Sequence, residues 1–143
     1  MFSVDCIFCR IVNGEVPIYK VFEDDRILAF LDVQPLSRGH TLIIPKVHVA
    51  LLEDLEWEDA NALFKVIYEL VEKVQEAVNA PASTVAINNG VESGQEIPHV
   101  HFHLIPRFKN DRGGPIHAIM REKPHLTRDE MIQIAERISN LSI

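Results

Sequence analysis

The 143-residue sequence predicts an α+β fold with one antiparallel sheet. β-prone and helical segments are mixed without the regular strand–helix–strand alternation that is typical of a parallel sheet. A long amphipathic helix stands in the middle of the chain. The chain contains no internal repeat, low-complexity segment or linker, so we expect residues 1–143 to form a single domain.

The first elements are a short helix and a hairpin. The helix is predicted over residues 5–12, where Asp5 can cap its start and Gly14 can end it. Two β-prone runs follow, residues 19–22 and 27–31, with a charged turn between them. This arrangement is typical of two antiparallel strands joined by a tight turn.

The middle of the chain predicts a strand, a long helix and another strand. The strand over residues 40–44 ends at Pro45, because proline cannot donate to a sheet ladder. The helix over residues 57–80 carries apolar side chains at spacings of three and four, and Pro81 stops it. We interpret its apolar stripe as core. A further strand is predicted over residues 84–87.

The last predicted strand, residues 99–105, alternates histidine with apolar residues. In an extended strand His99, His101 and His103 lie on one face, and the intervening apolar side chains face the core. An irregular segment and a helix over residues 127–141 complete the chain, which gives about five strands in all.

Composition limits the classes of partner. The formal net charge is −7 without a basic cluster, which argues against binding long nucleic acids. No apolar run is long enough for a membrane helix, and the start of the chain resembles no export signal. We therefore expect a cytoplasmic protein with neither a membrane nor a long nucleic acid as partner.

Two cysteines at a spacing of three indicate a metal or redox site. On a helix Cys6 and Cys9 face the same way. With His48 and one strand histidine they make a tetrahedral donor set for zinc. A redox pair is the alternative, although such a pair normally follows a strand in a thioredoxin-like pattern, which is absent from this sequence. A metal-bound histidine has its lone pair committed, so two strand histidines remain for phosphate chemistry.

The stretch from His99 to Ile105 resembles the motif of the histidine triad (HIT) superfamily, in which three histidines alternate with apolar residues. The similarity runs from about Asp5 to Arg107, and the final helix resembles the extension of bacterial and archaeal members. Its other matching segments are residues 5–11, 30–33, 39–48 and the pair Gly94-Gln95. The resemblance implies a HIT-like fold with its core in residues 5–107.

The resemblance implies a nucleotide hydrolase or nucleotidyl transferase. His101 would attack the α-phosphate of a purine nucleoside phosphate derivative, such as one of AMP or GMP. Water would then hydrolyse the nucleotidyl-histidine intermediate and release a nucleoside monophosphate. His103 would bond the phosphate oxygens, and His40 would complete the polar cluster.

The resemblance also implies cofactor, partner and binding residues. It assigns a structural zinc to Cys6, Cys9, His48 and His99, whose four ligands leave no open position, and it implies a homodimer. The residues expected around the nucleotide are Ile7, Phe8, Ile11 and Val33 at the base, Asp32 at the ribose, and Asn88, Gln95 and His103 at the phosphate.

One residue departs from the motif. Glu96 stands where many members carry serine or threonine, and an ionised carboxylate repels phosphate where a hydroxyl can donate. The sequence leaves open whether Glu96 faces the site. It also does not separate phosphoramidate, dinucleoside polyphosphate and adenylyl sulfate substrates. A zinc-stabilised nucleotide- or partner-binding module with little turnover is the alternative function.

Overall fold

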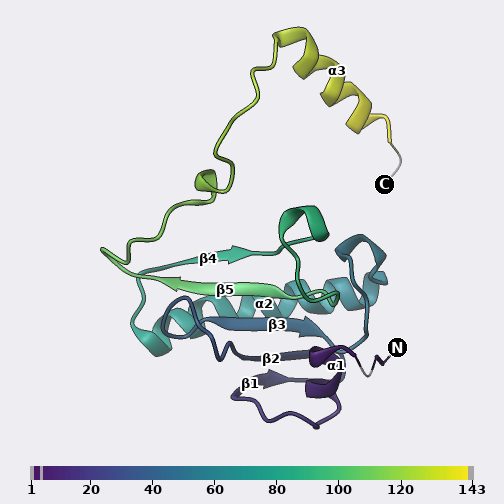
Figure 1. Ribbon diagram of the computed structural model, residues 1–143. Coiled ribbons are helices and arrows are strands. Elements are labelled where there is room, and N and C mark those ends of the chain that lie inside the picture. The colour runs from purple at the N-terminus through teal and green to yellow at the C-terminus, as the bar shows by residue number, and fades with distance from the viewer. Residues whose placement is uncertain (1, 4, 142–143) are drawn as a thin grey trace. The chain divides into compact units, whose positions relative to one another are not determined.

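Figure 1 shows the computed structural model, which describes residues 2–3 and 5–141. The chain divides into two compact units, Met1–Gly113 and Gly114–Ile143. The first unit contains the sheet and every residue singled out above for chemistry. The second contains the C-terminal helix.

The first unit is built on a five-stranded sheet in the order β1-β2-β3-β5-β4. Each neighbouring pair is antiparallel, which confirms the predicted α+β class. The strands are β1 (Lys20–Glu23), β2 (Ile27–Leu31), β3 (Thr41–Pro45), β4 (Ala82–Ala86) and β5 (Phe102–Arg107).

Two separate apolar clusters lie between the sheet and the helices. The long helix α2 (Trp57–Val78) contributes to one cluster, and the short helix α1 (Ile7–Val12) contributes to the other. Alternate side chains of β2 pack into the two clusters, Ile27 with α2 and Leu28 with α1. Because side chains alternate along a strand, the clusters lie on opposite faces. This double burial explains why β2 is a continuous apolar run and why β3 is apolar after Thr41.

The alternation of β5 places the histidines relative to these faces. Val100, Phe102 and Leu104 are buried in the cluster that contains α2. The side chains of His101 and His103 therefore lie toward the opposite face, where α1 packs. Phe8 of α1 contacts the His101 ring there, with a centroid distance of 5.0 Å.

All three helices differ from the sequence-based predictions at a boundary, and the C-terminal helix, predicted over residues 127–141, spans Arg128–Ser139. The N-cap of α1 is Cys6 and not Asp5, because the Cys6 Sγ accepts the backbone N–H of Cys9 at 3.5 Å. Helix α2 ends at Val78, earlier than predicted, because Asn79 adopts a left-handed conformation with φ of 57°.

The sheet also differs at its last two strands. β4 begins two residues before the predicted strand and ends one residue earlier, and β5 begins at Phe102 and not at His99. The pairing of β5 with β3 stops at Phe102, and the preceding Val100 N–H donates instead to the carbonyl of Val49. The prediction that all three histidines lie within one strand is therefore wrong for His99 and His101.

The second unit carries α3 (Arg128–Ser139), whose predicted capping box is present. Thr127 Oγ1 accepts the Glu130 N–H at 3.2 Å, and Glu130 Oε2 accepts the Thr127 N–H at 2.7 Å.

Short 3₁₀ turns occur in both units, at Leu52–Asp54, Val91–Ser93 and Ile116–Ala118. Among the described helices, none is both long and apolar enough to cross a membrane.

Candidate metal and catalytic sites

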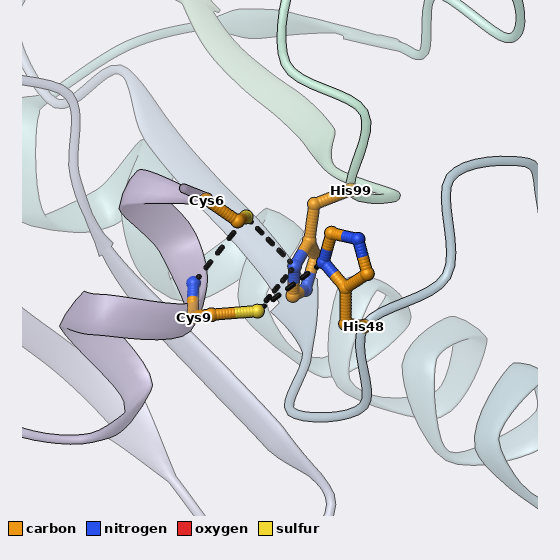
Figure 2. A group of neighbouring side chains, drawn as sticks. All are labelled: Cys6, Cys9, His48 and His99. Carbon is orange, nitrogen blue, oxygen red and sulfur yellow. Dashed lines mark hydrogen bonds between the residues drawn. The ribbon is translucent and has the colours of Figure 1, made fainter. Parts of the chain in front are cut away.

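Two cysteines and two histidines converge from three parts of the chain (Figure 2). We call Cys6, Cys9, His48 and His99 the Cys/His cluster; their potential ligand atoms all lie within 4.8 Å of one another. Cys9 Sγ lies 3.2 Å from His48 Nδ1 and 3.7 Å from His99 Nδ1. Cys6 Sγ lies 3.5 Å from His99 Nδ1. Cys6 caps α1 and Cys9 lies within it, the loop after β3 supplies His48, and the segment before β5 supplies His99.

A backbone carbonyl orients the His99 ring toward the thiols. A carbonyl can only accept, so the His99 Nε2–H donates to Pro45 O at 2.8 Å and the Nδ1 lone pair is left facing the sulfurs. Burial lowers the pKa of His99 to about 4, and it raises the pKa of the Cys9 thiol. This donor set suits tetrahedral zinc, since a bound cation would draw the protons off the thiols.

A second group of side chains lies around His40 and His103. We call it the histidine cluster, and its members are His40, His101, His103 and the neighbouring Asp32. The backbone N–H of Leu36 donates to His40 Nδ1 at 3.1 Å, so the neutral His40 ring carries its proton on Nε2. His40 Nε2 lies 2.9 Å from His103 Nδ1 and donates to it. His103 therefore carries its own proton on Nε2, as a donor.

Burial keeps both of these histidines neutral. It is the main cause that lowers the pKa of His40, and it lowers the pKa of His103 to about 4. Asp32 Oδ2, 3.8 Å from His40 Nδ1, acts in the opposite direction on both pKa values. The result is a hydrogen-bonded chain from Leu36 through His40 to His103 that needs no charge.

A backbone carbonyl sets the tautomer of His101. Its Nδ1–H donates to the backbone carbonyl of His99 at 2.7 Å, so in the neutral ring the lone pair is on Nε2. The His101 and His103 ring centroids lie 5.2 Å apart. A ring with an acceptor Nε2 thus lies beside a ring with a donor Nε2–H.

A cavity of about 580 Å³ opens beside these two histidines. His101 and all eight of the residues expected around a nucleotide line it: Ile7, Phe8, Ile11, Asp32, Val33, Asn88, Gln95 and His103. His40 is buried behind His103 and is not among the lining residues. The structure adds an apolar segment that sequence reasoning missed, Val16, Pro17 and Ile18.

Gln95 uses its side chain within the protein. Its amide group donates to the carbonyls of Ala50 and Ile97, at 2.8 and 3.0 Å, and its Oε1 accepts the Gly90 N–H at 2.8 Å. Both amide hydrogens are therefore committed. Gln95 lines the cavity as a residue that fixes the loop 88–97 against the segment after His48.

The motif departure, Glu96, also lines the cavity. The residue is exposed to solvent. Among the described residues, none forms an ion pair with its carboxylate. The sequence left open whether Glu96 belongs to the site, and in the structure this residue borders the cavity.

Known proteins resemble this chain over most of its length. The family model described as HIT domain matches residues 13–110. An uncharacterized HIT-like protein of Borreliella burgdorferi is 45% identical over 112 residues, which are 77% of this chain and 81% of the relative. The adenosine 5'-monophosphoramidase hnt1 of Schizosaccharomyces pombe is 42% identical over 110 residues, 77% of this chain and 80% of that protein. The adenylylsulfatase HINT3 of Arabidopsis thaliana is 40% identical over 107 residues, 75% of this chain and 54% of that protein.

Solved structures agree with the fold. A HIT family protein from Bacillus anthracis superposes with a TM-score of 0.85 at 35% identity, covering 96% of this chain and 97% of its own. A Zn-bound histidine triad family protein from Mycobacterium smegmatis gives a TM-score of 0.72 at 32% identity, covering 92% and 96%. With the family model, the sequence relatives and these structures in agreement, the chain belongs to the HIT domain family.

Proposed function

We propose that this protein cleaves purine nucleoside phosphate derivatives at the α-phosphate and releases a nucleoside monophosphate. Relatives at 40% and 42% identity are named as an adenylylsulfatase and a monophosphoramidase, which supports nucleotide hydrolysis at the level of the family. The observation that carries the proposal is the His101 ring, whose Nδ1–H is held by a carbonyl while the ring lines the cavity.

The proposed first step is attack by His101. Its Nε2 lone pair forms a bond to the α-phosphorus as the bond from phosphorus to the leaving group breaks, and the leaving group departs with that electron pair and takes up a proton from solvent water. The His103 Nε2–H donates to a phosphoryl oxygen, where negative charge develops. His40 holds the donor in this tautomer, 2.9 Å from His103.

The second step is hydrolysis of the nucleotidyl-histidine. The oxygen of a water molecule bonds to the phosphorus as the nitrogen–phosphorus bond breaks, so His101 regains its lone pair and the monophosphate leaves. The attacking water gives one proton to solvent, which balances the proton that the leaving group took up in the first step. The carbonyl of His99 keeps the Nδ1 proton in place through both steps, since it stays 2.7 Å from that nitrogen. In this scheme no proton has to leave the His101 Nδ1.

We propose that the nucleotide base occupies the apolar wall of the cavity. Ile7, Phe8, Ile11 and Val33 supply that wall, and the Asp32 carboxylate, which already accepts the Gln34 N–H at 2.9 Å, has capacity left for ribose hydroxyls. Asn88 lines the cavity together with His103, and we assign its amide group as a donor to phosphate.

We propose that the Cys/His cluster holds one structural zinc. Bound there, the ion would cross-link α1, the loop after β3 and the segment before β5, with no open position for substrate. The convergence of four ligand atoms within 4.8 Å supports this, as does the similarity to a Zn-bound histidine triad protein. The zinc would hold His99, whose carbonyl in turn holds His101.

We further propose a cytoplasmic homodimer. A reducing compartment suits two buried, unpaired cysteines. The edge strand β4 and the exposed Trp57 and Tyr68 of α2 offer a surface for a second copy. Sedimentation at micromolar concentration should give twice the 16.3 kDa chain mass; the mass of one chain would contradict the dimer.

A panel assay of AMP release tests the proposed function. The wild-type protein would be given an adenosine phosphoramidate, diadenosine tetraphosphate and adenylyl sulfate, and we expect turnover of at least one. Rapid quenching without acid should trap labelled nucleotide on His101. Tight nucleotide binding without turnover of any of the three would favour a binding module instead.

A further inference from the structure

We propose that Glu96 makes this site selective for the charge of the leaving group. It favours a nucleoside monophosphate joined to a neutral or cationic group, such as an amine, over a substrate whose leaving group is a polyphosphate. The inference rests on the proposed function and deepens it by naming the substrate class. Its basis is the charge of the cavity wall and the position of Glu96 in it.

The cavity wall carries negative charge and no opposing basic side chain. Of the described residues that line it, none is lysine or arginine, whereas Asp32 and Glu96 are both acidic. Its two histidines each use Nδ1 within the protein, His103 towards His40 and His101 towards the carbonyl of His99, so each offers only Nε2 to a ligand. A site for several phosphates normally contains basic side chains, because they offset the repulsion among the anions.

The donors that remain suit a single phosphoryl group. His103 presents its Nε2–H, and Asn88 adds an amide. These are neutral hydrogen bonds, which can hold one phosphoryl oxygen each but do not cancel the charge of a chain of phosphates. The wall therefore accommodates one phosphoryl group and penalises each further anionic group.

Glu96 lies on a segment with a fixed position. The preceding residue, Gln95, donates to the carbonyls of Ala50 and Ile97 and accepts from the Gly90 N–H. The two residues that flank Glu96 are thus tied to the rest of the unit. The Glu96 carboxylate is exposed and is not neutralised by an ion pair among the described residues.

In the proposed orientation of the nucleotide, the leaving group lies next to the part of the cavity wall that contains Glu96. Asp32 is assigned to the ribose and the residues of α1 to the base. The loop 88–97, which supplies Asn88, Gly94, Gln95 and Glu96 to the cavity, is left to face the group on the far side of the phosphorus. A carboxylate there attracts an ammonium and repels a phosphate.

The experiment compares three substrates that differ in leaving-group charge. They are AMP joined by a phosphorus–nitrogen bond to 1,4-diaminobutane, AMP joined in the same way to butylamine, and diadenosine tetraphosphate. Values of kcat/KM would be measured at low salt for wild type, Glu96→Gln and Glu96→Ser. The matched control is Glu92→Gln, the same charge change on the same loop at an exposed residue outside the cavity wall.

We expect the wild type to prefer the diaminobutane substrate over the butylamine substrate. Glu96→Gln should reduce this preference by about three- to tenfold, the size expected for one charge pair near the surface. The same variant should raise the relative kcat/KM for the tetraphosphate by a similar factor. Added salt should weaken the wild-type preference, whereas Glu92→Gln should leave it unchanged.

Two results would overturn the inference while leaving the proposed function intact. One is a substrate preference that stays within twofold of wild type in both Glu96 variants, which still turn over the butylamine substrate. The other is an equal loss of preference in Glu92→Gln, because that would indicate net charge and not a local contact. Failure of the wild type to cleave any nucleotide substrate would instead contradict the proposed function.

Discussion

The Cys/His cluster and the histidine cluster both contain histidines, but the ring nitrogens are arranged differently in the two clusters. In the first, the His99 lone pair and the two thiols face a common centre, and the sulfur–nitrogen distances are long, between 3.2 and 3.7 Å. In the second, a donor nitrogen of His40 meets an acceptor nitrogen of His103 at 2.9 Å. Converging lone pairs suit a cation, and an alternating chain of donors and acceptors suits proton-bearing contacts to a phosphate.

The difference is set by backbone carbonyls. His99 gives its Nε2–H to Pro45 O and keeps a lone pair on Nδ1, whereas His101 gives its Nδ1–H to His99 O and keeps a lone pair on Nε2. Two residues that are two positions apart thus present different nitrogens. The nitrogen that a histidine presents in this protein follows from the partner of its other nitrogen, and each prediction below changes one residue of the two clusters.

The largest effect is expected for His101→Asn. Removal of the lone-pair nitrogen eliminates the covalent route, so kcat should fall by roughly 10⁴-fold or more, while nucleotide Kd stays near that of wild type. Steady-state kinetics and isothermal titration measure the two values. His117→Asn, at an exposed histidine of the second unit, is the matched control. A near-wild-type kcat for His101→Asn would refute the assignment of the nucleophile.

The next largest effect concerns the metal. Purified wild type should carry about one zinc per chain, and Cys9→Ser should lose most of it together with a large drop in Tm, because binding free energy of the metal is folding free energy. Elemental analysis and thermal unfolding check this. Metal-free wild-type protein with two freely titrating thiols would contradict the prediction.

A smaller effect concerns pH and the histidine cluster. The pKa of His103 is lowered mainly by burial from 6.5 to about 4, so between these values the unfolded chain binds more protons than the folded one. The stabilisation is complete above about pH 6.5 and is lost as pH falls toward 4. His103→Asn should therefore lose less unfolding free energy between pH 7 and pH 5 than wild type does.

Urea denaturation at the two pH values measures this difference. Both proteins keep the Cys/His cluster, so any acid loss of zinc is common to them. His125→Asn, at an exposed histidine, should retain the wild-type pH dependence. Equal pH dependence in wild type and His103→Asn would show that His103 does not titrate with the lowered pKa.

The smallest effect is expected for Asp32→Asn. A carboxylate that accepts from ribose hydroxyls rejects 2′-deoxyribose, so wild type should prefer the ribonucleotide substrate and the variant should lose about tenfold of that preference. The ratio of kcat/KM for the two substrates measures it. Asp25→Asn, the same charge change at an exposed hairpin residue, should leave the ratio unchanged.

Much of the fold follows from local patterns in the chain. The spacing of apolar side chains predicted α2 with its observed start at Trp57, and the capping box predicted α3. The start of β5 was not predictable in the same way. β5 begins where its pairing with β3 begins, at the Ile43–Phe102 pair. Before that point, the Val100 N–H donates to the carbonyl of Val49 and not to β3.

The sequence alone determined which cysteines and histidines belong to the two clusters, because residue type and a family motif identify cysteines and histidines of related function. Only the tertiary structure decided which nitrogen each ring presents and that Glu96 borders the cavity. The physical reason is distance along the chain: the carbonyl that fixes His99 belongs to Pro45, 54 residues away, and the bonds that position the Glu96 segment reach Ala50, 45 residues from Gln95. Such partners are brought together only when the sheet and its loops have folded.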